Sequence, residues 1–291
     1  MPSCRGRFDD LARALLDKAP RAHKFDHGHV LVIAGGPGQG GAARLAARAA
    51  LRVGAGLVTI APPSTAMGEH AAAPDALMRR PVDGPQDLVG LLRDPRISTV
   101  LIGPGCGIER ALSLLPAVLQ AGRKTVFDAD ALTALSRHGG FQGLTQDHVL
   151  TPHLGEFARL FPDLARLLTA DGPDTLSRVD AARTASLRAG AVVLLKGADT
   201  VIGRGGLPVR IQASCYDAAA PWLGTAGSGD VLAGLIAGLL ARGFAAGHGA
   251  AIGAALHAAA GRVLGPGLIA DDLPEILPRI IKNVIQSTDY K

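Results

Sequence analysis

One run of small residues that ends in a carboxylate has the composition of a phosphate site. Residues 224–230 read GTAGSGD and lead directly into the apolar stretch that starts at Val231. Small residues let the backbone bend so that several N–H groups face one concavity, and a helix start adds the positive end of its dipole. We expect Asp230 to act there as a catalytic acid or base beside a bound phosphate. The expected anion hole consists of Ala226, Gly227, Ser228 and Gly229.

A helix cap is the alternative interpretation of this run. Ser228 or Asp230 could accept hydrogen bonds from the first N–H groups of the helix, and glycines are common in turns. A cap does not require a row of small residues, however, which favours the phosphate site. The run is not a Walker loop, because no Lys-Ser or Lys-Thr follows the glycines.

Two further glycine-rich turns follow predicted strands, at residues 35–41 (GGPGQGG) and 103–107 (GPGCG). Gly36, Gly38 and Gly41 match the dinucleotide pattern G-x-G-x-x-G, which makes a Rossmann dehydrogenase an alternative. That fold expects an acidic residue at the end of the second strand, whereas residues 59–64 read TIAPPS. We therefore expect the first turn to approach a substrate closely or to form part of a lid.

The elements that must position these turns alternate between short aliphatic runs and helical patterns. This alternation predicts an α/β fold, with a mainly parallel sheet and helices on both faces. No Pro/Ser-rich linker interrupts it, so residues 1–291 are expected to form one domain, with 1–22 as a helical lead-in. The candidate strands are 29–34, 57–61, 99–103, 125–128, 149–151, 191–196 and 200–203. The candidate helices are 42–53, 108–121, 131–138, 155–168, 176–189, 228–242, 248–264 and 273–285.

Several polar motifs stand at the carboxyl ends of these strands, where open α/β sheets bind their ligands. They are DAD at 128–130, TPH at 151–153 and KG at 196–197. Their convergence on one edge predicts a single site shared with the glycine turns. Asp128 and Asp130 could instead form a turn and cap the next helix. His257, on an Ala-rich helix, is interpreted as a packing residue.

Composition argues against several classes of protein. The net charge of +5 comes with no basic run and an aromatic content of only 3%, so nucleic acid is not an expected partner. The three Cys form no C-x-x-C pair, which favours a reducing compartment. The N-terminus is charged where a signal peptide needs an apolar stretch, and no apolar run is long enough to span a bilayer. We expect a cytoplasmic protein without a membrane partner.

Taken in order, these motifs resemble the ADP-dependent (S)-NAD(P)H-hydrate dehydratase family, a carbohydrate-kinase-like domain of the ribokinase-like superfamily. The matching blocks cover most of the chain, and their order and spacing are more specific than any one of them. The blocks are GHVLVIAGG (28–36), GA (41–42), ALRVGAG (50–56), GPGCG (103–107), DADAL (128–132), LTPHLGE (150–156), VLLKGADT (193–200) and GSGDVLAG (227–234).

The resemblance implies a three-layer α/β/α fold and a reaction. ADP would phosphorylate the hydroxyl of the S-epimer of hydrated NADH or NADPH (NADHX or NADPHX), with Asp230 as the base. Loss of phosphate would then restore NAD(P)H and release AMP and phosphate. This order makes chemical sense, because phosphate is a much better leaving group than hydroxide.

The resemblance also implies site residues. The substrate is expected to contact Ala42, Gly105, Gly107, His153 and Asp230. ADP or AMP is expected to contact Lys196, Gly197, Ala198, Asp199, Thr200 and Gly229. Glu156 is expected to hold Mg²⁺ through water. Each of three residues also has an alternative interpretation. His153 could be a surface turn residue, Lys196 a solvated strand end and Glu156 an ordinary acid in the first turn of a helix.

The same resemblance implies a homo-oligomer, with a tetramer favoured, and an epimerase supplied as a separate chain. A ribokinase-like kinase for a hydroxymethylpyrimidine, a thiazole alcohol or a sugar is an alternative function that would use Asp230 in the same way. A non-catalytic nucleotide sensor is another alternative. The preference for ADP over ATP rests on the resemblance alone.

Overall fold

The computed structural model describes residues 16–71, 74–170, 172, 175–215 and 218–286. The strands of these residues form one nine-stranded sheet in the order β3-β2-β1-β4-β5-β6-β7-β8-β9. Neighbouring strands are parallel from β3 to β7, whereas β8 and β9 each run antiparallel to the strand before them. The strands are β1 His29–Ile33, β2 Leu57–Ala61, β3 Met78–Arg79, β4 Ile97–Ile102, β5 Lys124–Phe127, β6 His148–Leu150, β7 Val192–Leu195, β8 Asp199–Arg204 and β9 Leu207–Ala213.

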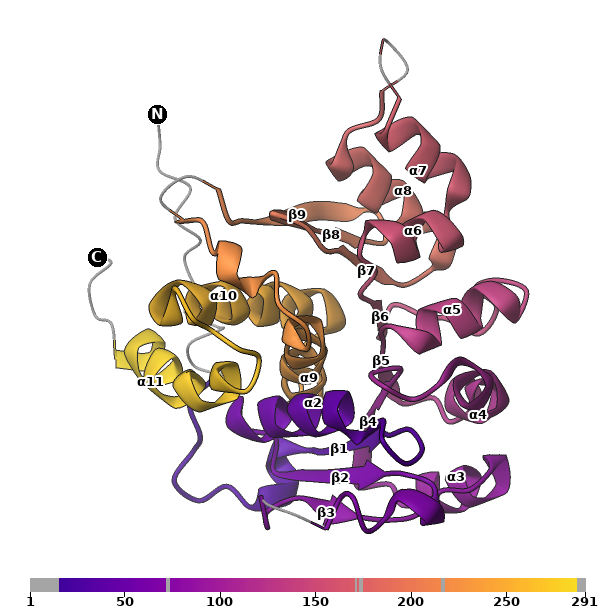
Figure 1. The fold of residues 1–291 in the computed structure, drawn as a ribbon, viewed down its shortest axis with the longest axis vertical. Helices are drawn as coiled ribbons and strands as arrows, with labels where there is room; N and C mark the ends of the chain where they lie inside the picture. Colours follow the sequence, from indigo (N-terminus) through magenta and orange to yellow (C-terminus); the bar gives the residue numbers. More distant parts are fainter. Residues whose placement is uncertain (1–15, 72–73, 171, 173–174, 216–217, 287–291) are drawn as a thin grey trace.

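Helices cover both faces of the sheet, so the molecule has three layers (Figure 1). One face carries α2 Gly40–Arg52, α9 Ser228–Ala241 and α10 Ala246–Leu264, with α11 Asp272–Gln286 packed outside them. The other face carries α3 Pro85–Leu92, α4 Ile108–Gln120, α5 Asp130–Arg137, α6 Leu154–Leu160, α7 Pro162–Leu168 and α8 Arg178–Ala189. Because β1 to β7 are parallel, their carboxyl ends lie along one edge, where the polar motifs follow them.

The aliphatic strands are buried on both sides. On β1, Leu31 and Ile33 belong to the core beneath α3 to α8, and Val30 and Val32 belong to the core beneath α2, α9 and α10. Successive side chains of a strand point to opposite faces, so a strand between two helix layers must be apolar throughout. This explains why the strands appear in the sequence as short aliphatic runs rather than as alternating patterns.

The predicted α/β class with helices on both faces is confirmed, and some element predictions need correction. The sequence patterns did not predict the short β3, the helix α3 or the edge strand β9. The predicted helix 155–168 is two helices, because the chain turns at Phe161, which has a φ of −136° and a ψ of 65°, and Pro162 takes the first position of the second helix. The lead-in over 1–22 lies largely outside the described residues. None of the described helices is both long and apolar enough to cross a bilayer.

Close packing of α2 on α9 positions the turn at residues 224–230, the predicted phosphate turn. Gly234 allows the two helices to pack this closely. A Cβ atom at Gly234 would lie 2.1 Å from the carbonyl oxygen of Ala46 on α2. We expect Gly234→Ala to lower the free energy of unfolding by about 1–3 kcal/mol, because the two helix backbones must separate. Chemical denaturation measures the change. Gly90→Ala is the control, since Gly90 lies on α3 with nothing within 4 Å of its Cβ position; an equal loss in both variants would contradict the packing argument.

Candidate active site

A partly buried lysine lies between two carboxylates at the carboxyl ends of β5, β6 and β7. The Nζ atom of Lys196 donates a hydrogen bond to Oδ1 of Asp128 at 2.8 Å and lies 3.7 Å from Oε2 of Glu156. The hydroxyl of Thr151 also donates to Oδ1 of Asp128, at 2.8 Å. Burial disfavours the charge of Lys196, yet attraction by Asp128 and Glu156 holds its pKa above the ordinary value. The lysine is therefore an ammonium at neutral pH.

Asp230 faces the same charges from the first turn of α9. Burial and the negative charge of Asp128 raise the pKa of Asp230 to about 7, while Lys196 partly opposes the rise. A carboxyl group with this pKa exchanges its proton readily at neutral pH, as an acid/base catalyst must. The sequence predicted that Asp230 lies beside a bound anion; the tertiary structure adds the acidic neighbours that raise its pKa.

The start of α9 has the features of an anion hole. Gly227, the residue before the helix, has a φ of 86° and provides no side-chain cap. The first N–H groups of a helix have no carbonyl partner within it, so they remain available to an anion. The Ser228 hydroxyl does not cap the helix either: it lies 3.0 Å from Nε2 of the buried His257. These facts argue against Ser228 as the helix cap and favour the phosphate site.

His257 fixes the position of Ser228 from the neighbouring helix α10. Its Nε2 also lies 2.9 Å from the carbonyl oxygen of Ser228, which can only accept, so Nε2 carries the hydrogen. Burial lowers the pKa of His257 to about 4, which keeps the imidazole neutral. The interpretation of His257 as a packing residue was therefore incomplete, because this residue holds the backbone of the phosphate turn.

A cavity of about 470 Å³ opens beside this turn. Five of the residues expected at the nucleotide line this cavity. They are Lys196, Gly197, Ala198 and Thr200, at the end of β7 and the start of β8, and Gly229 on α9. Asp199, also expected at the nucleotide, is engaged elsewhere: its Oδ1 accepts from the Ser214 N–H at 3.3 Å and from the Cys215 thiol at 2.7 Å. The remaining lining residues are Gln212, Ser214, Ala219, Ala220, Pro221, Leu223, Gly224, Ser228, Leu232, Ala254, His257 and Ala258.

The first and third glycine turns pack directly against each other. A Cβ atom at Gly35 would lie 1.9 Å from the carbonyl oxygen of Gly105, so only glycine permits this approach. Gly105 in turn lies against Ala42, whose Cβ would be 3.3 Å from a Cβ at Gly105. The N–H of Gly107 donates to Oδ2 of Asp130 at 2.8 Å. The positions expected at the substrate are thus brought together with the strand end that carries Asp128.

His153 and Glu156 form a reciprocal cap at the start of α6. The Nδ1 atom of His153 accepts from the Gly155 N–H at 2.9 Å, and Oε2 of Glu156 accepts from the His153 N–H at 2.8 Å. The His153 side chain is 57% exposed, whereas that of Glu156 is 7% exposed. The cap orients both groups, leaves Nε2 of His153 3.6 Å from Oε1 of Glu156, and directs Glu156 toward Lys196. Glu156 is therefore more than an ordinary first-turn acid.

Backbone strain marks the loop between Asp128 and Asp130. Ala129 has a φ of 45° and a ψ of −117°, and among the described residues it is the one non-glycine with a positive φ. Such a conformation costs about 1–3 kcal/mol and persists where the surroundings enforce it, often at functional sites. From the sequence, Asp128 could also be interpreted as a turn-forming residue. Its position at a strand end indicated a functional role, but its burial and its pairing with Lys196 are seen only in the tertiary structure.

The side chains at this site fit a metal ion that binds together with a nucleotide better than a metal ion held by the protein alone. Among the described residues, no group of three or more His, Cys, Asp or Glu side chains could hold a metal ion. Mg²⁺ commonly keeps several waters and binds through one or two carboxylates together with substrate phosphates. The buried carboxylate of Glu156, 3.7 Å from the Lys196 ammonium, suits a water-mediated contact of this kind.

The chain resembles known proteins over most of its length. A family model described as NAD(P)H-hydrate dehydratase matches residues 30–282. The bifunctional NAD(P)H-hydrate repair enzyme of Gloeobacter violaceus is 38% identical over 246 residues, which are 80% of this chain and 45% of that protein. The chain spans less than half the length of the first curated relatives that it matches.

Solved structures agree with the family model. The ADP/ATP-dependent NAD(P)H-hydrate dehydratase of Bacillus subtilis, co-crystallised with ATP and Mg²⁺, is 26% identical with a TM-score of 0.77, covering 94% of this chain and 95% of that chain. Ribokinase of Arabidopsis thaliana shares the fold alone, with a TM-score of 0.57 and 13% identity over 90% of this chain and 99% of that chain. The fold is ribokinase-like, and the chain belongs to the NAD(P)H-hydrate dehydratase family.

Proposed function

We propose that this protein catalyses the ADP-dependent dehydration of the S-epimer of NADHX and NADPHX, and so repairs hydrated nicotinamide cofactors. The observation that carries the proposal is that Asp230, with its pKa raised to about 7, lies among the charges of Asp128 and Lys196, while Lys196 and the uncapped start of α9 line one cavity. Membership of the dehydratase family supports the choice of substrate. The printed name of the Bacillus subtilis relative supports a nucleotide as co-substrate.

The first chemical step is transfer of a phosphoryl group. Asp230 takes the proton from the hydroxyl of the hydrate as its oxygen attacks the β-phosphorus of ADP, and AMP leaves. The N–H groups at the start of α9 bind the oxygens of the transferring group. The ammonium of Lys196, held between Asp128 and Glu156, offsets the negative charge of the nucleotide. Glu156 would hold Mg²⁺ through water, and an ion bound there with the nucleotide would neutralise phosphate charge.

The second step restores the nicotinamide double bond. The carbon–oxygen bond breaks, and phosphate leaves with the bonding electrons. Loss of a proton from the adjacent ring carbon then forms the carbon–carbon double bond. The products are NAD(P)H, AMP and phosphate, so hydrolysis of ADP drives removal of the hydroxyl. In this arrangement Ala42, Gly105, Gly107 and His153 contact the dinucleotide, and residues 196–200 with Gly229 contact ADP.

The test is incubation of the protein with (S)-NADPHX, Mg²⁺ and ADP, following recovery of the reduced-nicotinamide absorbance. We expect one AMP and one phosphate for each NADPH formed, and a separate arm with ATP measures the nucleotide preference. Parallel arms offer hydroxymethylpyrimidine, a thiazole alcohol and ribose. Phosphorylation of one of these alcohols without recovery of absorbance would identify a small-molecule kinase instead, and binding of ADP without any turnover would identify a sensor.

The same proposal includes a setting for the reaction. We place the protein in the cytoplasm, where an epimerase would convert the R-epimer to the S-epimer. We also propose a homo-oligomer, with a tetramer favoured. Exposed apolar side chains near the cavity support a subunit contact: Trp222 is 47% exposed, Val263 52% and Ile269 55%. Light scattering of the purified protein measures the oligomeric state.

A further inference from the structure

The turn between β1 and α2 is occupied by a carboxylate of the protein itself. The N–H groups of Gly38 and Gly40 donate to Oε2 and Oε1 of Glu69, at 2.7 and 2.9 Å. The Arg44 guanidinium donates to Oε1 of Glu69 at 3.1 Å. Paired N–H groups at a helix start, with an arginine beside them, are the groups that bind phosphate in many proteins. Here Glu69 takes the place of such an anion.

A buried imidazole without a partner faces the same turn. His70 is 1% exposed, and neither of its ring nitrogens has a hydrogen-bond partner among the described residues. A Cβ atom at Gly40 would lie 2.8 Å from Cε1, the ring carbon bonded to both nitrogens, so that edge of the ring points at the helix start. An unsatisfied buried polar group is costly, and such a group in a native protein needs an explanation. A ligand with acceptor oxygens at this turn would satisfy it.

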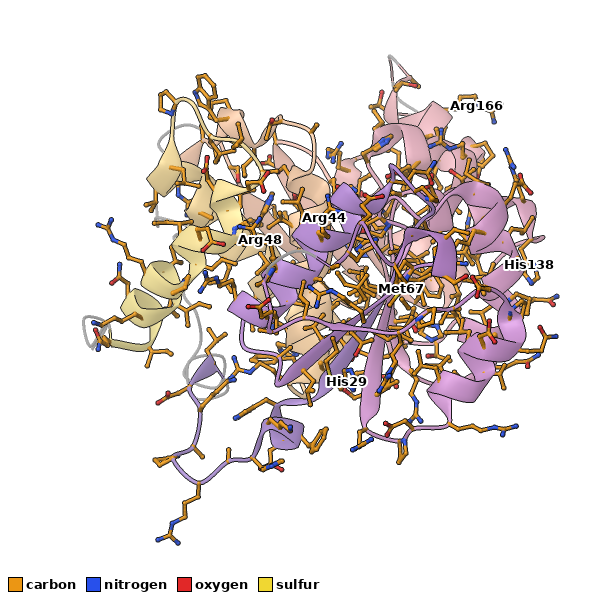
Figure 2. The ribbon with its side chains drawn as sticks, turned by 60° about the horizontal axis from the view of Figure 1, so that its bottom comes forward. His29, Arg44, Arg48, Met67, His138 and Arg166 are labelled. Atoms are coloured by element: carbon orange, nitrogen blue, oxygen red, sulfur yellow. The ribbon has the colours of Figure 1, made fainter. Side chains whose placement is uncertain are left out.

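The turn adjoins the positions that the proposed function assigns to the substrate. A Cβ at Gly105 would lie 2.6 Å from the carbonyl oxygen of Gln39, within the turn itself. Figure 2 shows Arg44 on α2 with Arg48 beside it, and Arg44 is the nearer of the two to the start of the helix. The side chains of Arg44 and Glu69 are 33% and 28% exposed, so an incoming anion can reach this pair from solvent.

We propose that the turn at 36–41, together with Arg44 and His70, is a phosphate subsite for the dinucleotide substrate, and that Glu69 is a placeholder which the substrate displaces. The inference rests on the proposed function for the identity of the dinucleotide. The pyrophosphate bridge is the group with the right chemistry, since it presents several anionic oxygens to two N–H groups, a guanidinium and an imidazole. Glu69 keeps the N–H groups satisfied and the turn ordered while the subsite is empty.

If Glu69 is a placeholder, its substitution should raise the affinity of the turn for anionic ligands. If Glu69 only stabilises the turn, its substitution should not raise that affinity. Glu69→Gln keeps the size of the side chain but removes the charge that competes for Arg44. With the nucleotide site saturated by ADP, we expect this variant to bind NADH, NADPH and inorganic pyrophosphate about tenfold more tightly than the wild type. Arg44→Gln, which leaves Glu69 in place, is expected to bind all of them about tenfold more weakly. Isothermal titration calorimetry on the full chain measures these affinities.

The controls separate the possible outcomes. Glu275→Gln is the matched control: Glu275 also accepts from arginines, Arg48 and Arg52 on α2, but does not contact the turn, and its affinities should not change. Unchanged or weaker binding in Glu69→Gln, or unchanged binding in Arg44→Gln, would overturn the subsite. A gain for NADPH alone would assign the turn to the 2′-phosphate and overturn the assignment to the pyrophosphate bridge. Glu69→Ala repeats the test if the glutamine variant does not fold.

These measurements do not require turnover. If (S)-NADPHX is not dehydrated but the affinities change as expected, the proposed function fails and the phosphate subsite stands. If dehydration is observed and the affinities do not change, the subsite fails and the proposed function stands.

Discussion

Asp230→Asn is expected to lower the dehydration rate by about 10²-fold or more while ADP affinity changes little. The reason is that the amide cannot accept the hydroxyl proton, and a lost acid/base group costs about 10²–10⁴-fold in rate. Nucleotide affinity should be retained, because the backbone of the phosphate turn and Lys196 are unchanged. The measurements are single-turnover recovery of NADPH absorbance and calorimetric titration with ADP. Asp163→Asn, which alters an exposed carboxylate paired with Arg188 on α8, is the control.

The pH dependence provides a second check on Asp230. Its carboxylate form is the base, so the wild-type rate should rise with pH around a midpoint near 7, where the pKa of Asp230 lies. Asp230→Asn should remove this rise from whatever rate remains. A variant with near-normal turnover, or one that retains the same midpoint, would exclude Asp230 as the base.

The raised pKa also has a consequence for stability. The folded state binds the Asp230 proton more tightly than the unfolded state does, so this group lowers stability as pH rises from about 4 to about 7. Asp230→Asn removes the buried charge, and we expect the free energy of unfolding at pH 8 to rise by about 1–2 kcal/mol. A higher melting temperature together with lost activity would show that the Asp230 carboxylate is needed for catalysis but destabilises the folded protein.

Lys196→Met is expected to lower the free energy of unfolding by about 3 kcal/mol and to weaken ADP binding strongly. Removing the cation leaves Asp128 and Glu156 buried without their shared partner, and breaking a buried ion pair from one side costs about 3–5 kcal/mol. The Lys196 side chain is 19% exposed, which places the expected loss at the lower end. Lys196 also lowers the pKa of Asp230, so the pH–rate midpoint of the variant should move upward.

A neutral partner provides the control for this prediction. Lys124 is also partly buried, but its Nζ donates to the uncharged carbonyl oxygen of Phe244, at 3.0 Å. Lys124→Met should therefore cost about 1 kcal/mol and leave the midpoint in place. Adding Asp128→Asn to Lys196→Met should recover part of the stability but not the ADP affinity. Equal losses in the two lysine variants, or no recovery in the double variant, would refute a shared buried charge.

Hydrophobic periodicity predicted helix in residues 155–168 but not the break between α6 and α7. The chain turns at Phe161 and Pro162 begins the second helix, whereas Pro116 and Pro278 lie inside α4 and α11, so a proline by itself does not decide where a helix ends. The short β3 and the exposed β9 were missed because two residues, or a strand with mixed burial, leave too weak a pattern. The central strands were found because burial on both faces makes them continuously aliphatic.

The sequence by itself determined the α/β class and the glycine turns, and it indicated that strand ends would place Lys196, His153 and Asp230 along one edge. These features depend on local composition and periodicity, which a single chain displays directly. Only the tertiary structure decided the pairing of Lys196 with Asp128, 68 residues away, and the contact of His257 with Ser228, 29 residues away. Burial and charged neighbours set a pKa, and both come from segments that are distant in the sequence. The raised pKa of Asp230 is therefore a consequence of the tertiary structure, and no single stretch of the sequence could have predicted it.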